Sequence, residues 1–287
     1  MQTDLAKQLL KRFDRLKSNR QNWESHWQEV ADYMQPRKAD VTKTRSKGDK
    51  RTELIFDSSP LQAVELLASS LHGMLTNPST TWFSLRFKGG DFEDNDEAKA
   101  WLEDATEVMY TAFNKSNFQQ EIFELYHDLI TFGTAAMFIE DDEEDTLKFS
   151  TRHINEMYIS ENDKGRIDTI FRKFRLTARA AIQKFGANVS DNIVTVNRKD
   201  PYEEIEILHA IYPRSDFDPK KQDKANMPFE SVYLEAGTGD ELSVSGFKEF
   251  PFVVPRYLKA SHEIYGRSPA MTALPDVKML NEMSKTT

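Results

Sequence analysis

A chain of 287 residues can bury a sizeable core and form one large domain or two smaller ones. With 39% hydrophobic and 30% charged residues it is typical of a soluble globular protein. It contains neither the roughly 18 consecutive apolar residues of a membrane span nor, near Met1, the apolar core of a secretory signal. The net charge of −9 argues against a generic nucleic-acid-binding protein, and the lack of cysteine excludes disulfides, cysteine-bound metal centres and a thiol nucleophile.

The charge is distributed unevenly along the chain. Residues 1–51 carry 13 Lys and Arg against 7 Asp and Glu, whereas residues 91–145 carry 2 against 17. An acidic block of this size keeps a surface soluble and repels DNA. Within the basic part the cations concentrate in residues 37–51, which contain Arg37, Lys38, Lys43, Arg45, Lys47, Lys50 and Arg51.

Residues 2–34 are predicted to form one helix, or two helices with a break at Ser18-Asn19, and Pro36 ends this run. Residues 37–52 are almost devoid of apolar side chains, so we expect a loop that is mobile unless a partner orders it. Lys and Arg on a flexible arm can contact phosphates without reading a base sequence. The seven cations of this loop are therefore candidate contacts to DNA or to a partner, although a solvated loop is the commoner explanation for such a run of charges.

Residues 55–87 are predicted to form a helix, a turn and a short strand. Asp57 or Ser58 can cap the helix, and Pro60 suits its first turn. The helix carries an apolar stripe and, on much of its remaining surface, small residues that allow a neighbouring helix to approach closely. Asn77 and Pro78 end the helix, and residues 83–87 alternate as a half-buried strand does.

Helices are expected at about 95–114 and 119–132, the second ended by Gly133, and at 177–185, capped by Thr177. Alternating apolar residues predict strands at 136–139, 147–150, 157–159, 169–174, 204–212, 229–234 and 252–257. The fold class is therefore α+β, with helices packed against antiparallel strands. A last helix, 276–287, follows Pro269 and Pro275 and has no capping residue at its end, a pattern typical of a partial gene product.

The acidic run Glu140 to Asp145 is the strongest candidate for chemistry, because adjacent carboxylates can bind a divalent cation or transfer protons. It lacks the alternate spacing and central glycine of a calcium loop, and it lies between two predicted strands, so a solvated hairpin turn is the commoner explanation. The six histidines are scattered singly, without the pairing typical of zinc sites. They are His26, His72, His127, His153, His209 and His262. No catalytic, cofactor-binding or metal-binding residue is predicted, and no cofactor.

Four blocks of sequence resemble, in the same order, the head-to-tail connector (portal) proteins of short-tailed bacteriophages. The first block comprises Arg20, Trp23, Trp27, Tyr33 and Pro36. The second comprises Phe56-Asp57-Ser58-Ser59, Leu66-Leu67-Ala68-Ser69, Gly73-Met74-Leu75 and Trp82-Phe83. The third comprises Leu129-Ile130, Phe132-Gly133-Thr134-Ala135 and Ile139-Glu140. The fourth comprises Pro251, Pro255-Arg256, Tyr265-Gly266-Arg267-Ser268-Pro269, Ala273-Leu274-Pro275-Asp276, Lys278, Leu280-Asn281 and Met283.

The resemblance implies a structural protein of the virion, made in the host cytoplasm, and not an enzyme. Family members form homo-oligomeric rings, usually dodecamers, at one capsid vertex. A terminase motor pumps double-stranded DNA through the ring without sequence specificity, tail adaptor proteins dock on it, and no membrane is involved. Residues 1–268 would form the wing-like body and residues 269–287 the start of a stem helix, on which Lys278, Asn281 and Lys285 are candidate channel-facing residues. The clip, second stem helix and crown of the family are absent from this sequence.

Two alternatives remain open from the residues alone. One is a metal-dependent phosphotransfer enzyme that uses the acidic run Glu140 to Asp145. The other is a nucleic-acid adaptor that binds through the basic loop 37–51.

Overall fold

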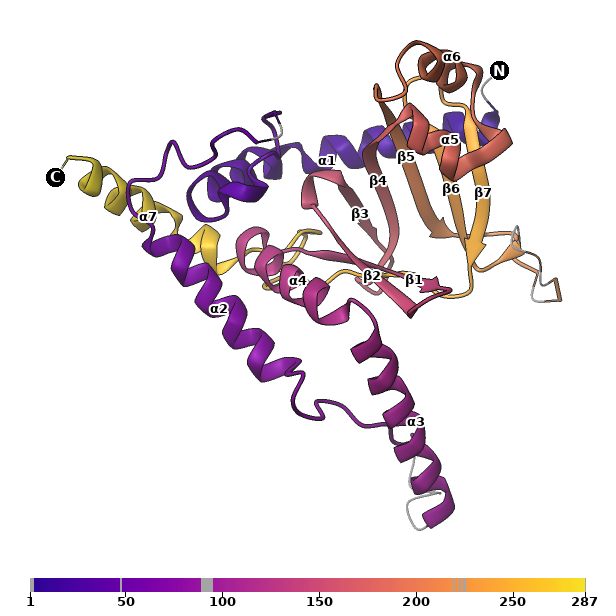
Figure 1. Ribbon diagram of the computed structural model, residues 1–287, viewed down its shortest axis with the longest axis horizontal. Helices are drawn as coiled ribbons and strands as arrows, with labels where there is room; N and C mark the ends of the chain where they lie inside the picture. The colour runs from indigo at the N-terminus through magenta and orange to yellow at the C-terminus, as the bar shows by residue number, and fades with distance from the viewer. Residues whose placement is uncertain are drawn as a thin grey trace. The chain divides into compact units, whose positions relative to one another are not determined.

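The computed structural model describes residues 3–46, 48–88, 95–218, 220–221, 223 and 226–286, and these form two compact units (Figure 1). The sheet unit comprises Met1–Ser25 and Asn155–Pro251, and the helical unit comprises His26–Ile154 and Phe252–Thr287. Helix α1, Asp4–Met34, contributes residues to both. The predicted α+β class with antiparallel strands is confirmed.

The sheet unit is built on a five-stranded antiparallel meander, in which each strand pairs with the next along the chain. Its strands are β3 (Met157–Glu161), β4 (Ile167–Thr177), β5 (Glu204–Pro213), β6 (Phe229–Glu235) and β7 (Glu241–Phe247). Side chains of a strand alternate between the two faces. In β5, Leu208 and Ala210 accordingly point to one face, whereas Ile205 and Ile207 point to the other.

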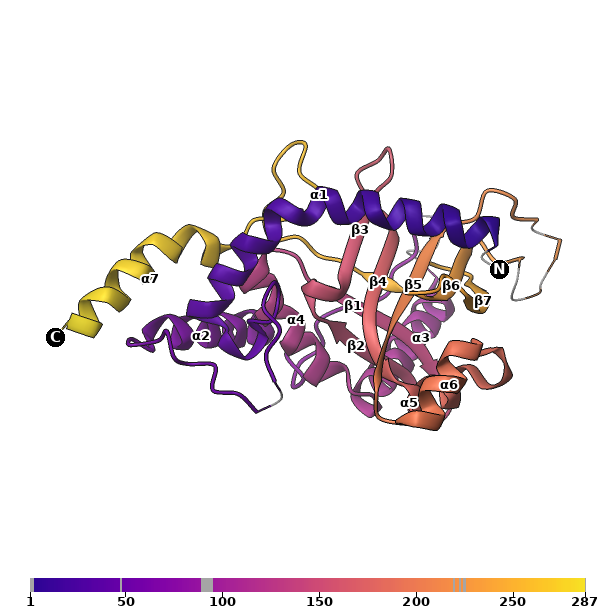
Figure 2. The same ribbon diagram turned by 90° about the horizontal axis from the view of Figure 1, so that it is seen from above.

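Helices cover both faces of this sheet. On one face α1 buries Ala6, Leu9 and Phe13 against Phe171 and Leu208 (Figure 2). The spacing of three and four residues places these α1 side chains on one side of the helix. The opposite face is covered by α5 (Ala178–Phe185) and α6 (Asp191–Lys199). Each of these short helices is capped by a hydroxyl, from Thr177 and Ser190, at its first residue.

Arg20 fastens α1 to the start of β3. Its guanidinium is buried, and it donates to the carbonyl oxygens of Asn155 and Met157 at 2.9 and 2.8 Å. The same group lies 3.7 Å from the centre of the Tyr158 ring and pairs with Glu24 at 2.6 Å. A buried arginine is tolerated here because its guanidinium N–H groups donate hydrogen bonds to these carbonyl and carboxylate oxygens, and an aromatic ring covers its face.

The helical unit combines four helices with a small three-stranded sheet. The helices are α2 (Ser59–Leu75), α3 (Asp96–Lys115), α4 (Phe118–Phe132) and α7 (Pro269–Thr286), besides the end of α1. The strands are β1 (Ala136–Asp142), β2 (Thr146–Arg152) and β8 (Phe252–Val253), in the order β2-β1-β8. Helix α2 packs on α4 through Pro60, Val64 and Ala68, its buried residues.

Two glycines let the end of α4 touch the segment that leads into α7. Gly133 ends α4 with a φ of 74°, in the left-handed region. A Cβ on Gly133 would lie 2.3 Å from the carbonyl oxygen of Gly266, and a Cβ on Gly266 would lie 2.3 Å from that of Gly133. Around this crossing the Thr134 hydroxyl accepts from Gly266 N at 2.8 Å, and the Ser268 hydroxyl donates to Thr131 O at 2.8 Å. The Ser268 hydroxyl also accepts from Met271 N in the first turn of α7.

The strand predicted at residues 83–87 is wrong. Among the described residues the segment pairs with no strand, because side chains of α3 satisfy its backbone instead. The Tyr110 hydroxyl accepts from Phe83 N at 2.6 Å and donates to Phe83 O at 3.1 Å, and the Thr106 hydroxyl accepts from Leu85 N at 3.2 Å.

Other boundaries also differ from the prediction. Helix α1 is continuous through Ser18-Asn19, and α7 begins at Pro269 with Pro275 inside it. Strand β8 ends at Val253, well before the predicted Tyr257. Helix α6 and strand β7 were not predicted.

Replacing either glycine of the crossing should destabilise the helical unit. We expect Gly266→Ala to lower the free energy of unfolding by about 1–3 kcal/mol through overpacking. Gly133→Ala should cost roughly 1–2 kcal/mol more, because an L-residue is strained at its positive φ. Chemical denaturation measures both effects.

The matched control is Gly73→Ala in α2, where an added Cβ meets nothing within 4 Å. Helix propensity predicts that this variant gains up to about 1 kcal/mol. Equal unfolding midpoints for all three variants would contradict the role assigned to the crossing.

Candidate assembly and nucleic-acid interface

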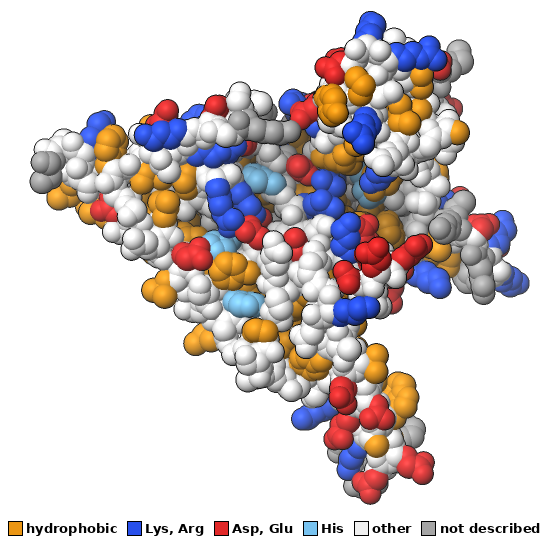
Figure 3. Space-filling view, viewed as in Figure 1, with side chains coloured by type: hydrophobic (Ala, Val, Ile, Leu, Met, Phe, Trp, Pro, Cys, Tyr) orange, Lys and Arg blue, Asp and Glu red, His pale blue; other side chains and the backbone are white. Residues whose placement is uncertain are grey.

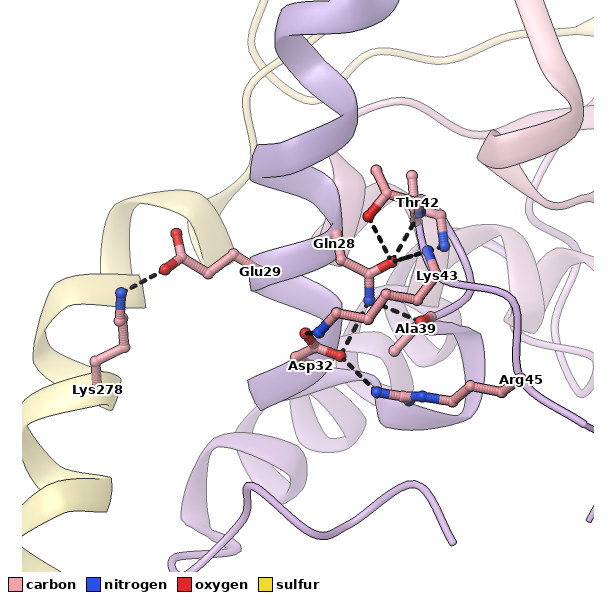
Figure 4. Close-up of polar contacts among 9 residues, drawn as sticks. Gln28, Glu29, Asp32, Ala39, Thr42, Lys43, Arg45 and Lys278 are labelled. Atoms are coloured by element: carbon pink, nitrogen blue, oxygen red, sulfur yellow. Dashed lines mark hydrogen bonds and ion pairs between the residues drawn. The ribbon is translucent and has the colours of Figure 1, made fainter. Parts of the chain in front are cut away.

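The basic loop that follows α1 is organised by one buried amide, that of Gln28. Its Oε1 accepts from the backbone N–H groups of Val41, Thr42 and Lys43 at 3.0, 2.8 and 3.2 Å. Its Nε2 donates to Ala39 O at 2.7 Å (Figure 4). A single side chain therefore satisfies donors and an acceptor of a segment that has no secondary structure of its own.

Asp32, one turn further along α1, neutralises two cations of this loop. Its carboxylate pairs with Lys43 Nζ at 2.7 Å and with Arg45 at 3.2 Å, and it also accepts from Gln28 Nε2 at 3.0 Å (Figure 4). Asp32 is only 6% exposed. A buried carboxylate needs such partners, since an unpaired charge at this depth is costly.

Helix α4 supplies the acids for the start of the loop. Arg37 pairs with Glu124 at 2.7 Å, and Lys38 lies between Glu124 and Asp128 at 3.1 and 2.6 Å. Burial alone would raise the pKa of Glu124, but the hydrogen bond from Arg37 and the charge of Lys38 outweigh it and hold that pKa below its ordinary value.

The remaining cations of the predicted set differ in their surroundings. Arg51 pairs with Asp40 at 2.5 Å. Lys50 is exposed and forms no ion pair with the residues that the structure describes, and Lys47 lies outside them. Five of the seven predicted contact residues thus form ion pairs with acidic side chains of the same chain, and this pairing weakens their attraction for phosphates.

The three residues predicted to face a channel do not share one exposed surface. Asn281 is 3% exposed, and its amide donates to Leu54 O at 2.8 Å and accepts from Phe56 N at 2.7 Å. It therefore holds the segment before α2 against α7. Lys278 pairs with Glu29 of α1 (Figure 4). Lys285 pairs with Glu282 at 3.7 Å.

Large apolar side chains remain exposed on the helices of the helical unit (Figure 3). On α2 they are Leu66, Met74 and Leu75, on α3 Trp101, Val108 and Met109, and on α7 Met279, Leu280 and Met283. Leu66 and Met74 are 70% and 82% exposed, and the small residues Ala63, Ser70 and Gly73 of α2 are exposed as well. Apolar surface on several neighbouring elements is typical of a protein-binding surface.

The acidic run forms the β1–β2 hairpin, as the solvated-turn interpretation predicts. Among the described residues no group of three or more His, Asp or Glu is placed to hold a metal ion. His209 is stacked on Tyr233 and bonded to Ser231, and His153 contacts Lys38 O. No described helix has the length and apolarity needed to cross a membrane.

Comparison with known proteins places this geometry in context. The sequence matches the family described as bacteriophage head to tail connecting protein over residues 6–287. It is 33% identical over 279 residues to a probable portal protein of Bordetella phage BPP-1, and 35% identical over 283 residues to a portal protein of Salmonella phage epsilon15. Each match covers 96% of this chain, and 50% and 51% of the relatives, so the chain spans about half the length of the curated relatives it matches.

Removing the Gln28 amide should release the basic loop. Gln28→Leu leaves backbone N–H groups of the loop without an acceptor, so we expect a loss of about 1–3 kcal/mol in unfolding free energy and faster tryptic cleavage at Lys43 and Arg45. Gln21→Leu, the same change at an exposed position of α1, should stay within about 0.5 kcal/mol of the wild type. Unchanged cleavage in Gln28→Leu would show that the loop is held by other contacts.

Glu124 should make stability depend on pH. Its folded pKa is lowered, so its contribution is present above the unfolded pKa and is lost as the pH falls through the folded value. We expect the difference in unfolding free energy between wild type and Glu124→Gln to shrink from about pH 7 to about pH 3. A difference that is constant over this range would contradict the ion pairing.

Proposed function

Because this chain belongs to the bacteriophage head-to-tail connecting protein family, we propose that it is part of a portal subunit. In this function, copies of the protein form a ring at one capsid vertex, DNA is packaged and ejected through the ring, and the tail attaches to it. The observation that carries the proposal is the family match over residues 6–287. The two curated relatives are named as portal proteins, one of them as probable.

Exposed apolar side chains support assembly of several copies. Covering a side chain such as Leu66 or Met74 contributes roughly 1.5–3 kcal/mol. The small residues beside them on α2 allow the backbone of a second helix to come close. A ring is built from heterologous contacts, in which one face of a copy meets a different face of the next. We propose that the exposed face of α2 is one of these contact faces.

The distribution of charge supports a channel that does not bind the passing DNA tightly. A protein through which DNA passes benefits from weak attraction, since tight phosphate binding would oppose movement. The net charge is −9, and the basic loop is largely neutralised by Asp32, Glu124 and Asp128. We propose that double-stranded DNA passes without sequence-specific contacts, and that Lys50 and its neighbours in the loop make at most weak phosphate contacts.

The finer organisation and the partners belong to the same proposal. Residues 1–268 form the wing-like body and α7 begins the stem, with Lys278 and Lys285 directed toward the channel. The ring, a dodecamer in the natural protein, binds a terminase motor, the major capsid protein and a tail adaptor. The protein is made in the host cytoplasm and is incorporated into the virion, where its role is structural and not enzymatic. The portal names of both relatives favour this role over phosphotransfer at the acidic run and over a nucleic-acid adaptor.

The natural full-length protein should form closed rings that mass photometry resolves as one large species. Leu66→Asp with Met74→Asp places charges on the proposed contact face of α2 and should shift the population to monomers by at least roughly tenfold, the effect of a few kcal/mol per contact. Tyr202→Asp, at an exposed aromatic of the sheet unit, should leave the rings intact. A strictly monomeric wild type at all concentrations would refute the proposal.

A further inference from the structure

A cationic groove of about 520 Å3 lies in the sheet unit between the first turns of α1 and the end of β5. Lys11, Arg12 and Arg15 line it from successive turns of α1, and Gln8 and Ser215 add polar groups. The three cations are exposed, and none of them forms an ion pair with a described residue. Unlike the five paired cations of the basic loop, they are therefore available to the charge of a partner.

A buried tyrosine lies beneath these cations. Tyr212 is only 6% exposed. The Arg12 guanidinium lies 5.1 Å from the centre of its ring. Burial, and next the hydrogen bond to Glu230, raise the pKa of Tyr212, so the hydroxyl stays protonated. Glu230, the one acid of the groove lining, is paired with Arg214 at 3.2 Å.

The helical unit offers a matching anion at the tip of the β1–β2 hairpin. Asp141, Glu143, Glu144 and Asp145 are exposed, and none of them forms an ion pair with a described residue. The two-stranded ladder of Ala136–Asp142 with Thr146–Arg152 holds this tip as a narrow, defined projection. Carboxylates of like charge held this closely repel one another and are stabilised by an external cation.

We propose that the cationic groove of one copy receives the acidic hairpin tip of a neighbouring copy, with the three α1 cations contacting its carboxylates. The inference rests on the ring proposed above and adds one of its contacts. A heterologous ring requires two different, mutually complementary surfaces on every copy, and this chain carries both. DNA phosphate is the competing anion, but the net charge of −9 opposes its approach.

Cysteine cross-linking tests the contact directly, because the 287-residue chain contains no cysteine of its own. Gln8→Cys at the groove and Glu143→Cys at the tip are placed in separate preparations, mixed and oxidised. We expect intermolecular disulfides to form roughly tenfold faster than in a control mixture of Gln8→Cys with Asp104→Cys, an exposed acid of α3. Raising the salt to about 0.5 M should remove most of this preference. Rates equal to the control would overturn the inference.

Charge reversal supplies an independent test in the natural full-length protein. The groove variant is Lys11→Glu, Arg12→Glu and Arg15→Glu, and the tip variant is Glu143→Lys, Glu144→Lys and Asp145→Lys. Each alone should lose ring assembly by roughly tenfold or more, because like charges then face each other. An equimolar mixture should recover it, since each variant's groove is complementary to the other's tip. Arg179→Glu, Arg198→Glu and Lys199→Glu, on α5 and α6, form the matched control and should assemble normally.

The outcomes separate this inference from the ring itself. Rings that persist in both reversed variants overturn the groove contact and leave the portal proposal standing. If the wild type forms no rings, the portal proposal fails, and the cross-linking rate still decides the groove contact. A groove variant that keeps its rings but loses DNA binding assigns the groove to nucleic acid and overturns the inference. The cysteine variants leave every groove cation in place. If a charge-reversal variant fails to fold, the cross-linking rate therefore still tests the groove contact.

Discussion

The close crossing of Gly133 and Gly266 is the contact on which the helical unit depends. It joins two segments that are distant in sequence, and it is possible only because neither residue has a side chain. The hydroxyls of Thr134 and Ser268 complete the junction, and Ser268 at the same time bonds to the first turn of α7. The crossing therefore fixes where α7 starts relative to α4 within this unit. Close approach of backbones is one of the few structural tasks that glycine alone performs.

The family motifs act in this chain as packing and joining elements. Arg20 ties α1 to β3, and the Trp27 indole donates to Phe132 O at 3.1 Å beside the Tyr265 ring. Gly133 and Gly266 form the crossing, and Asn281 holds the segment before α2. Each of these residues satisfies a buried polar group or permits a close contact.

Local signals in the sequence were sufficient for much of the fold. The cap at Thr177, the terminator Gly133 and the alternation of four of the five meander strands, β3 to β6, were identified correctly, because each depends on residues close in sequence. Helix α6 was missed because its β-branched Ile193, Val194, Thr195 and Val196 resemble a strand, and β7 was missed because Ser243, Ser245 and Gly246 dilute its alternation. Residues 83–87 alternate like a strand, but hydroxyls of α3 replace the missing strand partner.

The candidate surfaces depend on contacts that no local pattern reveals. The seven cations of the basic loop were apparent from composition, whereas their pairing with Asp32, Glu124 and Asp128 requires helices α1 and α4 to be in place. Lys11, Arg12 and Arg15 were not predicted as a binding site, because charged residues are common on an exposed helix. Only the fold places them around Tyr212. The resemblance of four sequence blocks to the connector family, in contrast, is confirmed over nearly the whole chain.

Cryo-electron microscopy of the natural full-length protein tests most directly the claim that these side chains serve to hold copies together. We expect closed rings in which the exposed face of α2 around Leu66 and Gly73 is buried against the next copy. A particle in which that face remains in solvent, or a preparation without any ring, would contradict the claim.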